Sequence, residues 1–173
     1  VLIRPSYVLS GAAMNLCFND RDLDEYIHEA TRISQEYPVT VSKFLARAKE
    51  IELDAVAKEG SVLVAIISEH IEYAGVHSGD ASIVLPSQTL SIEIEEKMKA
   101  AAKEIAKVLN ITGPFNIQFL LRDNEIFIIE TNLRASRTFP FISKATGINL
   151  IKIFVEALFT KDIPKIKLTI FSK

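Results

Sequence analysis

The fold is decided by residues 115–132, FNIQFLLRDNEIFIIETN. Two apolar runs flank a turn at Asp123-Asn124, a pattern that predicts a β-hairpin. A turn centred there pairs residues whose numbers sum to about 247. Gln118 is then opposite residue 129, which places it beside Glu130 to within one residue of register. Because residues two apart in a strand face the same side, Glu130 and Asn132 share a face at the end of the second strand.

Gln118, Glu130 and Asn132 bring one carboxylate and two amides to this edge of the predicted sheet. Such a set is too hard and too low in charge for zinc, and it suits Mg²⁺ held largely by nucleotide phosphates. Arg134 and Arg137 follow, where their guanidinium groups could bind phosphate oxygens or a carboxylate-like substrate. A metal and cationic clamps are what phosphoryl transfer requires. The alternative interpretation is a charged turn after a core strand.

Hydrophobic spacing outside the hairpin predicts three helices. The first is capped by Asp20 or Asp22 and runs to about residue 35, and the third covers 141–159 with an interruption at 147–149. The predicted buried positions are Leu23, Ile27, Ala30 and Ile33 in the first helix, and Ile94, Met98, Ala102, Ile105 and Leu109 in the second.

Further strands are predicted at 1–3, 39–44, 51–57 and 62–67, with a turn at Glu59-Gly60 between the last two. Because hairpins outnumber crossover connections, the element order predicts α+β layers with mostly antiparallel sheets.

Residues 69–80 are predicted to form a polar loop that contains His70 and His77. The HExxH pattern of zinc proteases is absent. Gly75 and Gly79 allow close approach of the backbone, so exposed amides could meet a phosphate or an adenine edge. The alternative for His77 is a structural role, hydrogen-bonded within the loop.

Arg4 stands at the end of the first predicted strand, before a segment around Ser10-Gly11 that is expected to be a mobile loop. An arginine in this place could hold phosphates, although lone arginines are usually surface ion pairs. The segment lacks the glycines and the Lys-Ser/Thr ending of a Walker A motif, which argues against a P-loop NTPase.

Composition restricts the function classes. Hydrophobic residues make up 49% and charged residues 24% of 173 residues, which is typical of a folded globular protein. The formal net charge of −2, without a basic patch, argues against nucleic-acid and membrane-surface partners. Cys17 is the only cysteine, which excludes disulfides and cysteine-based zinc sites within the chain and fits a reducing compartment. No apolar run approaches the ~20 residues that a membrane-spanning helix needs.

Six segments form a recognisable set when they are taken in order: RPSYVL (4–9), EHIE (69–72), AGVHSGD (74–80), NIQF (116–119), ETNLRASR (130–137) and PFISKATG (140–147). Together they resemble carbamoyl-phosphate synthetase large chains over roughly residues 1–160. The large chain carries two related ATP-grasp units. Tyr7 and Pro140-Phe141 resemble the second unit, which phosphorylates carbamate.

The resemblance implies an ATP-grasp fold, with the nucleotide between two α+β lobes, and the cofactors ATP and Mg²⁺ or Mn²⁺. On that pattern Gln118, Glu130 and Asn132 are metal ligands, of which the first two also contact nucleotide. Arg134 and Arg137 face the transferred phosphate and the carbamate. The other implied nucleotide contacts are Arg4 with phosphates, Lys43 and Leu45 beside adenine, Glu50 with ribose, and the loop residues Gly75, Val76, His77 and Ser78.

The resemblance also implies a small lobe with a phosphate loop (1–46), a larger lobe with the metal site (47–165) and a tail (166–173). The family's fold has elements before the first strand here, so the chain is expected to be an incomplete piece that is inactive alone. The expected partners are ATP, carbamate, the rest of the large chain and a glutaminase subunit or domain. The expected location is cytoplasmic or mitochondrial, in pyrimidine or arginine biosynthesis. The alternatives are another ATP-grasp carboxylate ligase, such as a biotin carboxylase type, and a non-catalytic module that binds nucleotide or a partner.

Overall fold

The computed structural model describes residues 1–6, 14–33, 38–76 and 81–159. The predicted loop around Ser10-Gly11, and residues Tyr7, Gln35, Gly79 and Asp80, lie outside the described residues. The chain divides into two compact units, Val1–Ala46 and Arg47–Lys173. No described helix is long and apolar enough to cross a membrane.

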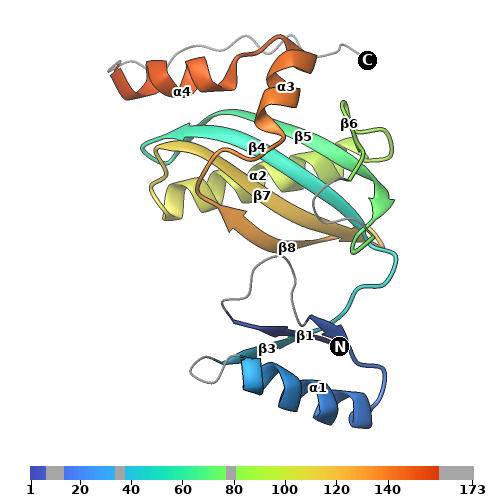
Figure 1. Cartoon of the computed structure of the whole chain (residues 1–173). Helices are drawn as coiled ribbons and strands as arrows, with labels where there is room; N and C mark the ends of the chain where they lie inside the picture. Colours follow the sequence, from blue (N-terminus) through green and yellow to red (C-terminus); the bar gives the residue numbers. More distant parts are fainter. Residues whose placement is uncertain (7–13, 34–37, 77–80, 160–173) are drawn as a thin grey trace. The chain divides into compact units, whose positions relative to one another are not determined.

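The first unit is a small antiparallel sheet packed against one helix (Figure 1). Its strands are β1 (Leu2–Pro5), β2 (Asn15–Leu16) and β3 (Val39–Ser42), in the order β2-β1-β3. Strand β3 ends at Ser42 instead of the predicted residue 44, because its ladder with β1 runs only from Leu2 to Pro5. Lys43, which falls within the predicted strand, and Leu45, which falls just beyond it, therefore both follow β3.

Helix α1 (Asp20–Ile33) is capped by Asn19 and not by the predicted Asp20 or Asp22. The amide of Asp22 donates to Asn19 Oδ1 at 2.9 Å, and the Asp22 carboxylate accepts from the amide of Phe18 at 3.0 Å. These two side chains satisfy amides at the helix start reciprocally, as in a capping box. The predicted apolar face is confirmed up to Ala30. Ile33 is 52% exposed because it is the last residue of the helix.

The second unit is a five-stranded antiparallel sheet with helices on both faces. The strand order is β6-β5-β4-β7-β8. The strands are β4 (Lys49–Lys58), β5 (Ser61–Tyr73), β6 (Ile83–Val84), β7 (Gly113–Arg122) and β8 (Glu125–Asn132). The helices are α2 (Ile92–Val108), α3 (Phe139–Thr146) and α4 (Leu150–Phe159).

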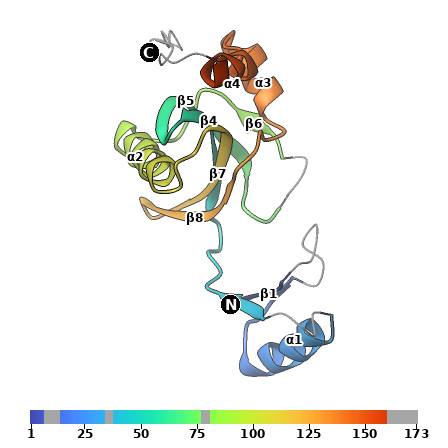
Figure 2. The same cartoon turned by 90° about the vertical axis from the view of Figure 1, so that its left-hand side faces the viewer.

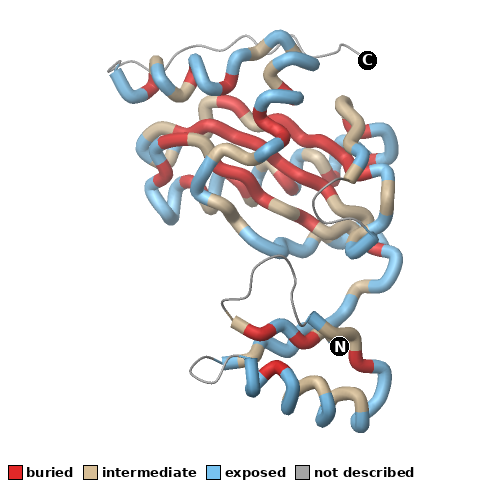
Figure 3. The backbone as a smooth tube through the Cα atoms, in the orientation of Figure 1, coloured by how far each residue is buried: buried red, intermediate tan, exposed pale blue. Residues whose placement is uncertain are grey.

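The two faces of this sheet have different coverings. On one face, Ile51 and Leu53 of β4 pack with Met98 of α2. On the other face, Val56 and Ile66 pack with residues of α3 and α4. Figure 2 shows α2 and the α3–α4 pair on different sides of the sheet, and Figure 3 shows that burial is concentrated in its central strands. Helices α3 and α4 cover only part of the second face, so the rest of that face can carry polar side chains.

The turns of this unit follow the predicted pattern. Asp123 and Asn124 have φ values of 52° and 62°, and the positive sign at both positions is that of a hairpin turn matching the strand twist. Gly147, at φ 70°, ends α3 in the left-handed conformation and separates it from α4. Helix α2 buries its predicted face through Ala102, but Leu109 is 53% exposed because it lies at the C-cap.

Candidate functional site

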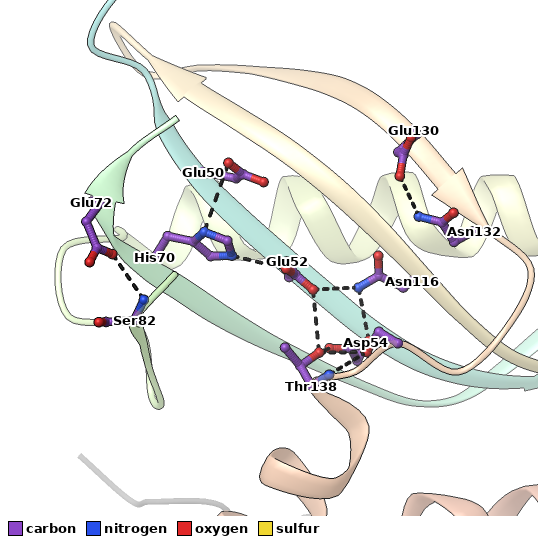
Figure 4. Close-up of polar contacts among 11 residues, drawn as sticks. Glu50, Glu52, Asp54, His70, Glu72, Ser82, Asn116, Glu130, Asn132 and Thr138 are labelled. Atoms are coloured by element: carbon purple, nitrogen blue, oxygen red, sulfur yellow. Dashed lines mark hydrogen bonds and ion pairs between the residues drawn. The ribbon is translucent and has the colours of Figure 1, made fainter. Parts of the chain in front are cut away.

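A polar surface continues beyond the part of the sheet that α3 and α4 cover. It originates in the alternation of β4, where Glu50, Glu52 and Asp54 point to one side while the residues between them enter the core against α2. Asn116 and Gln118 of β7 lie beside Asp54 and Glu52. We call this surface the polar face, and it comprises Glu50, Glu52, Asp54, His70, Asn116, Gln118, Glu130 and Asn132. Figure 4 shows all of these side chains except Gln118.

Gln118 and Glu130 lie directly opposite each other on β7 and β8. Near the turn the predicted register holds, with Phe119 paired to Ile128, but it shifts by one residue between Phe119 and Gln118. This β-bulge makes Ile129 an extra residue of β8 and brings Glu130 to the position opposite Gln118. The predicted neighbourhood of Gln118 and Glu130 is therefore confirmed, and their role as metal ligands stays a prediction.

Side-chain oxygens that could be metal ligands lie close together at the end of β8. Asn132 Nδ2 donates to Glu130 Oε1 at 2.8 Å, so these two side chains point toward each other (Figure 4). Arg134 donates to Asn132 Oδ1 at 3.3 Å. In the described part of the chain, no three His, Cys, Asp or Glu side chains are grouped so that they could hold a metal ion. The single carboxylate with the amides of Gln118 and Asn132 instead fits a hard cation that takes its other ligands from phosphates or water.

His70 and Glu52 form a buried ion pair, with Nε2 3.1 Å from Oε1. Burial by itself lowers the pKa of His70, but the hydrogen bond to Glu52 and the charges of Glu50 and Glu52 outweigh it and raise that pKa above 6.5. Burial likewise opposes ionisation of Glu52, but the hydrogen bond and charge of His70 hold the Glu52 pKa below 4.5. Both directions favour an imidazolium paired with a carboxylate.

His70 was predicted to lie in a loop, and this prediction is wrong. Strand β5 continues to Tyr73 because it pairs with β4 as far as Lys49 and with β6 through Glu69 and His70. The buried charged side chains Glu69 and His70 are tolerated inside this strand because each has a partner: His70 bonds Glu52, and Glu69 bonds Lys49.

Glu50 lies on the other side of the imidazole, with Oε2 4.0 Å from His70 Nδ1 (Figure 4). Burial raises the pKa of Glu50 above 4.5, and the charges of Glu52 and Glu130 act in the same direction, against those of His70 and Arg137. The charge of Arg137 also helps to lower the pKa of Glu52. Arg137 therefore lies within electrostatic reach of the carboxylates on β4.

Five of the predicted nucleotide contacts are not members of the polar face. Arg4 is exposed on β1, Lys43 is exposed and Leu45 is half-buried, all in the first unit. Gly75, at φ +86°, has open space around its Cα, and Val76 is 59% exposed. His77 and Ser78 lie outside the described residues. The nucleotide contacts assigned to these seven positions stay predictions.

Glu52 and Asp54 are members of the polar face that sequence reasoning missed. Their signal was present: residues 50–54 read EIELD, with an acid at every second position of a predicted strand. Such alternation places all the acids on one face. Thr138, which contacts both of these carboxylates, gives no comparable signal because its contacts span 86 and 84 residues of sequence.

Comparison with known proteins gives a consistent result. The chain matches the family model described as "Carbamoyl-phosphate synthase L chain, ATP binding domain" over residues 1–161. It is 52% identical over 158 residues to the multifunctional protein URA2 of Saccharomyces cerevisiae, covering 91% of this chain and 7% of that protein. It is 51% identical over 167 residues to the mitochondrial carbamoyl-phosphate synthase (ammonia) of Mus musculus, covering 96% of this chain and 11% of that protein. The chain thus spans about a tenth of the length of these relatives.

Solved structures show the same architecture. A biotin carboxylase ATP complex from Campylobacter jejuni matches with a TM-score of 0.77 and 16% identity, covering 96% of this chain and 39% of that one. The biotin carboxylase domain of 2-oxoglutarate carboxylase from Hydrogenobacter thermophilus, with MgADP, matches with a TM-score of 0.72 and 17% identity, covering 93% and 37%. At such identities the likeness concerns the fold alone, and it confirms the predicted α+β ATP-grasp fold.

Proposed function

Because the chain belongs to the family of carbamoyl-phosphate synthase large-chain ATP-binding domains, we propose that it binds ATP and Mg²⁺ and phosphorylates carbamate within a larger synthase. The observation that carries this proposal is the pairing of Gln118 with Glu130, with Asn132 bonded to Glu130 and two arginines following. In the reaction, the bond between the γ-phosphorus and the ADP oxygen breaks and a bond to a carbamate oxygen forms. The products are ADP and carbamoyl phosphate.

Gln118, Glu130 and Asn132 are the residues that would hold Mg²⁺ or Mn²⁺. When bound, the cation would neutralise charge on the nucleotide phosphates. The hydrogen bonds from Asn132 to Glu130 and from Arg134 to Asn132 keep the oxygens at one edge of the sheet. Because β7 and β8 are fixed by their ladder, little reorganisation is needed at this edge when the nucleotide arrives.

Arg134 and Arg137 would act on the transferred phosphate and the carbamate. Guanidinium groups present several donors in one plane, so they can bind two oxygens of a phosphate or carboxylate at once. Glu50 would bind ribose hydroxyls. The remaining proposed nucleotide contacts are Arg4, Lys43, Leu45, Gly75, Val76, His77 and Ser78.

We assign the chain to the second of the two ATP-grasp units because Tyr7 and Pro140-Phe141 resemble that unit. In this assignment residues 1–46 form a small lobe and 47–165 a larger one, with the rest of the large chain and a glutaminase as partners. The chain by itself is expected to show no useful turnover. Its short span relative to the curated relatives supports a role as part of a larger enzyme.

Calorimetry with a non-hydrolysable ATP analogue, with and without Mg²⁺, tests the nucleotide site. Binding that depends on Mg²⁺ should be lost in Glu130→Ala and retained in Glu125→Ala, an exposed acid at the start of the same strand. Equal loss in both variants, or no effect of Mg²⁺ on binding by the unsubstituted chain, would contradict the proposed ligand set.

The assignment to the second unit needs the full-length protein and its two partial activities. Arg137→Ala should strongly lower, to a small but measurable rate, phosphorylation of ADP by carbamoyl phosphate while bicarbonate-dependent ATP hydrolysis continues. The opposite pattern would place the chain in the first unit. Loss of neither activity would remove the catalytic role proposed for Arg137.

A further inference from the structure

Asp54 is completely buried in the polar face, yet neutral groups satisfy its carboxylate. Oδ1 accepts from Asn116 Nδ2 at 3.0 Å and from Ser136 Oγ at 2.5 Å, and Oδ2 accepts from Thr138 Oγ1 at 2.5 Å. Burial raises the pKa of Asp54, and these hydrogen bonds act against the effect of burial. A carboxylate without solvent is costly to keep, so these bonds matter for the local structure.

The two hydroxyl donors stand on either side of Arg137. Ser136 and Thr138 also contact each other: their hydroxyl oxygens lie 2.6 Å apart, and the Thr138 amide donates to Ser136 Oγ at 3.2 Å. Their contacts with Asp54 span 82 and 84 residues of sequence. The backbone of Arg137 is therefore held at both ends by one carboxylate of strand β4.

Thr138 is the N-cap residue of α3, but its side chain makes no capping hydrogen bond. A threonine at this position usually accepts from an amide of the first helical turn. Here its hydroxyl donates to Asp54 instead, and Glu52 Oε2 lies 3.4 Å from the same hydroxyl oxygen. The chain thus gives up a local helix-stabilising bond for one to β4.

Strand β4 also carries two carboxylates whose pKa values respond to the charge of Arg137. The charge of Arg137 acts on the pKa of both Glu50 and Glu52, which lie four and two residues before Asp54 in the same strand. Because a paired central strand is rigid, an anchor at Asp54 sets the position of Arg137 relative to these carboxylates.

We propose that Asp54 is a positioning residue for phosphoryl transfer: through Ser136 and Thr138 it holds Arg137 where its guanidinium meets the transferred phosphate. This inference rests on the proposed function. Asp54 itself does not touch the substrate, and it acts only through the segment between β8 and α3.

Variants of Thr138 in the full-length protein separate positioning from packing. Thr138→Ser keeps the hydroxyl and loses a methyl group, whereas Thr138→Val keeps the shape and loses the hydroxyl. Phosphorylation of ADP by carbamoyl phosphate is the readout. We expect Thr138→Val to lower kcat by about 10- to 100-fold, as for a misplaced catalytic group, with the KM for ADP changed by less than about twofold. Thr138→Ser should retain most of the wild-type kcat.

A double-mutant cycle tests whether Asp54 acts through Arg137. If it does, Asp54→Asn should lower kcat in the wild-type background and have little further effect in Arg137→Ala. Independent, multiplying effects would overturn the inference, as would a Thr138→Val protein with wild-type kcat beside an impaired Arg137→Ala. An inactive wild-type protein would instead remove the proposed function, and this inference with it.

Discussion

His70 and Glu52 join β5 to β4 through an ion pair that is almost entirely removed from water, since each side chain is only 3% exposed. Asn116 donates to the other oxygen of Glu52 at 3.0 Å, so the carboxylate has partners on both sides. Removing one member of such a pair leaves a buried charge without compensation, which is far more costly than losing a surface pair.

Glu52→Gln is therefore expected to lower the free energy of unfolding by about 3 kcal/mol near pH 6, measured by urea denaturation. The pKa of His70 is raised above 6.5, so its contribution is complete below pH 6.5 and is lost as pH rises through the folded-state pKa. The pKa of Glu52 is lowered below 4.5, so its contribution is present above pH 4.5 and is lost at lower pH. The difference between wild type and variant should shrink outside this window.

The control for this prediction is the pair between His28 and Asp24, which are 3.6 Å apart and 76% and 82% exposed. Asp24→Asn should change the free energy of unfolding by less than about 0.5 kcal/mol, because exposed ion pairs contribute little. Similar losses in the two variants would show that burial does not set the strength of the His70–Glu52 pair.

Glu69 precedes His70 in β5 and faces the opposite side of the sheet. We expect its carboxylate to make the stability of the protein depend on acid pH. Burial raises its pKa, but bonds from Lys49 and Thr89, and from the amides of Thr89 and Gln88, outweigh burial and lower it to about 2. Because the folded-state pKa lies below the ordinary 4.5, the stabilisation is present above pH 4.5 and disappears as pH falls toward 2. It amounts to at most about 3 kcal/mol.

Urea unfolding of wild type and Glu69→Gln across this pH range checks that prediction. The variant should be less stable at pH 7, and the gap should close as the pH approaches 2. Glu125→Gln, at the exposed start of β8, is the control and should not produce such a gap. A gap between wild type and Glu69→Gln that is constant with pH would contradict the assignment.

Two glycines with similar positive φ values allow backbone strain to be distinguished from steric crowding when each is replaced by alanine. Gly60 has φ +76°, and a Cβ there would lie 3.1 Å from the Cα of Lys107 and 3.3 Å from the carbonyl oxygen of Ala106. Gly147 has φ +70° and nothing within 4 Å of an added Cβ. Gly147→Ala should cost about 1 kcal/mol of left-handed strain, and Gly60→Ala clearly more, because α2 must also move. Thermal denaturation of both variants measures this, and equal costs would show that the crowding is relieved.

The sequence predicts most of the second unit because its signals are local. Alternation and turn residues identify both long hairpins, and Asp123-Asn124 places Gln118 next to Glu130. The one-residue shift that pairs them directly was not predictable, since nothing in the run of isoleucines shows where a bulge forms. The path of β5 through Glu69 and His70 was also missed, because their polarity is satisfied by partners distant in sequence.

The candidate site likewise has one part that local sequence patterns predict and another part that they do not. The donor set of Gln118, Glu130 and Asn132 follows from strand periodicity and one turn. The bonds that attach the segment around Arg137 to Asp54 span more than 80 residues of sequence. They form only when β4, β8 and α3 are packed together. Local sequence patterns carry no information about such long-range contacts.

In the described part of the chain β8 is an outer strand of its sheet, and it exposes Phe127, Ile128 and Ile129 by 37%, 47% and 40%. A straight outer strand of this composition would offer its free amides and carbonyls to another chain and promote aggregation. The bulge at Ile129 breaks the regular spacing of those groups and twists the strand locally. The irregularity that places Glu130 opposite Gln118 therefore also makes this edge a poor template for amyloid-like growth.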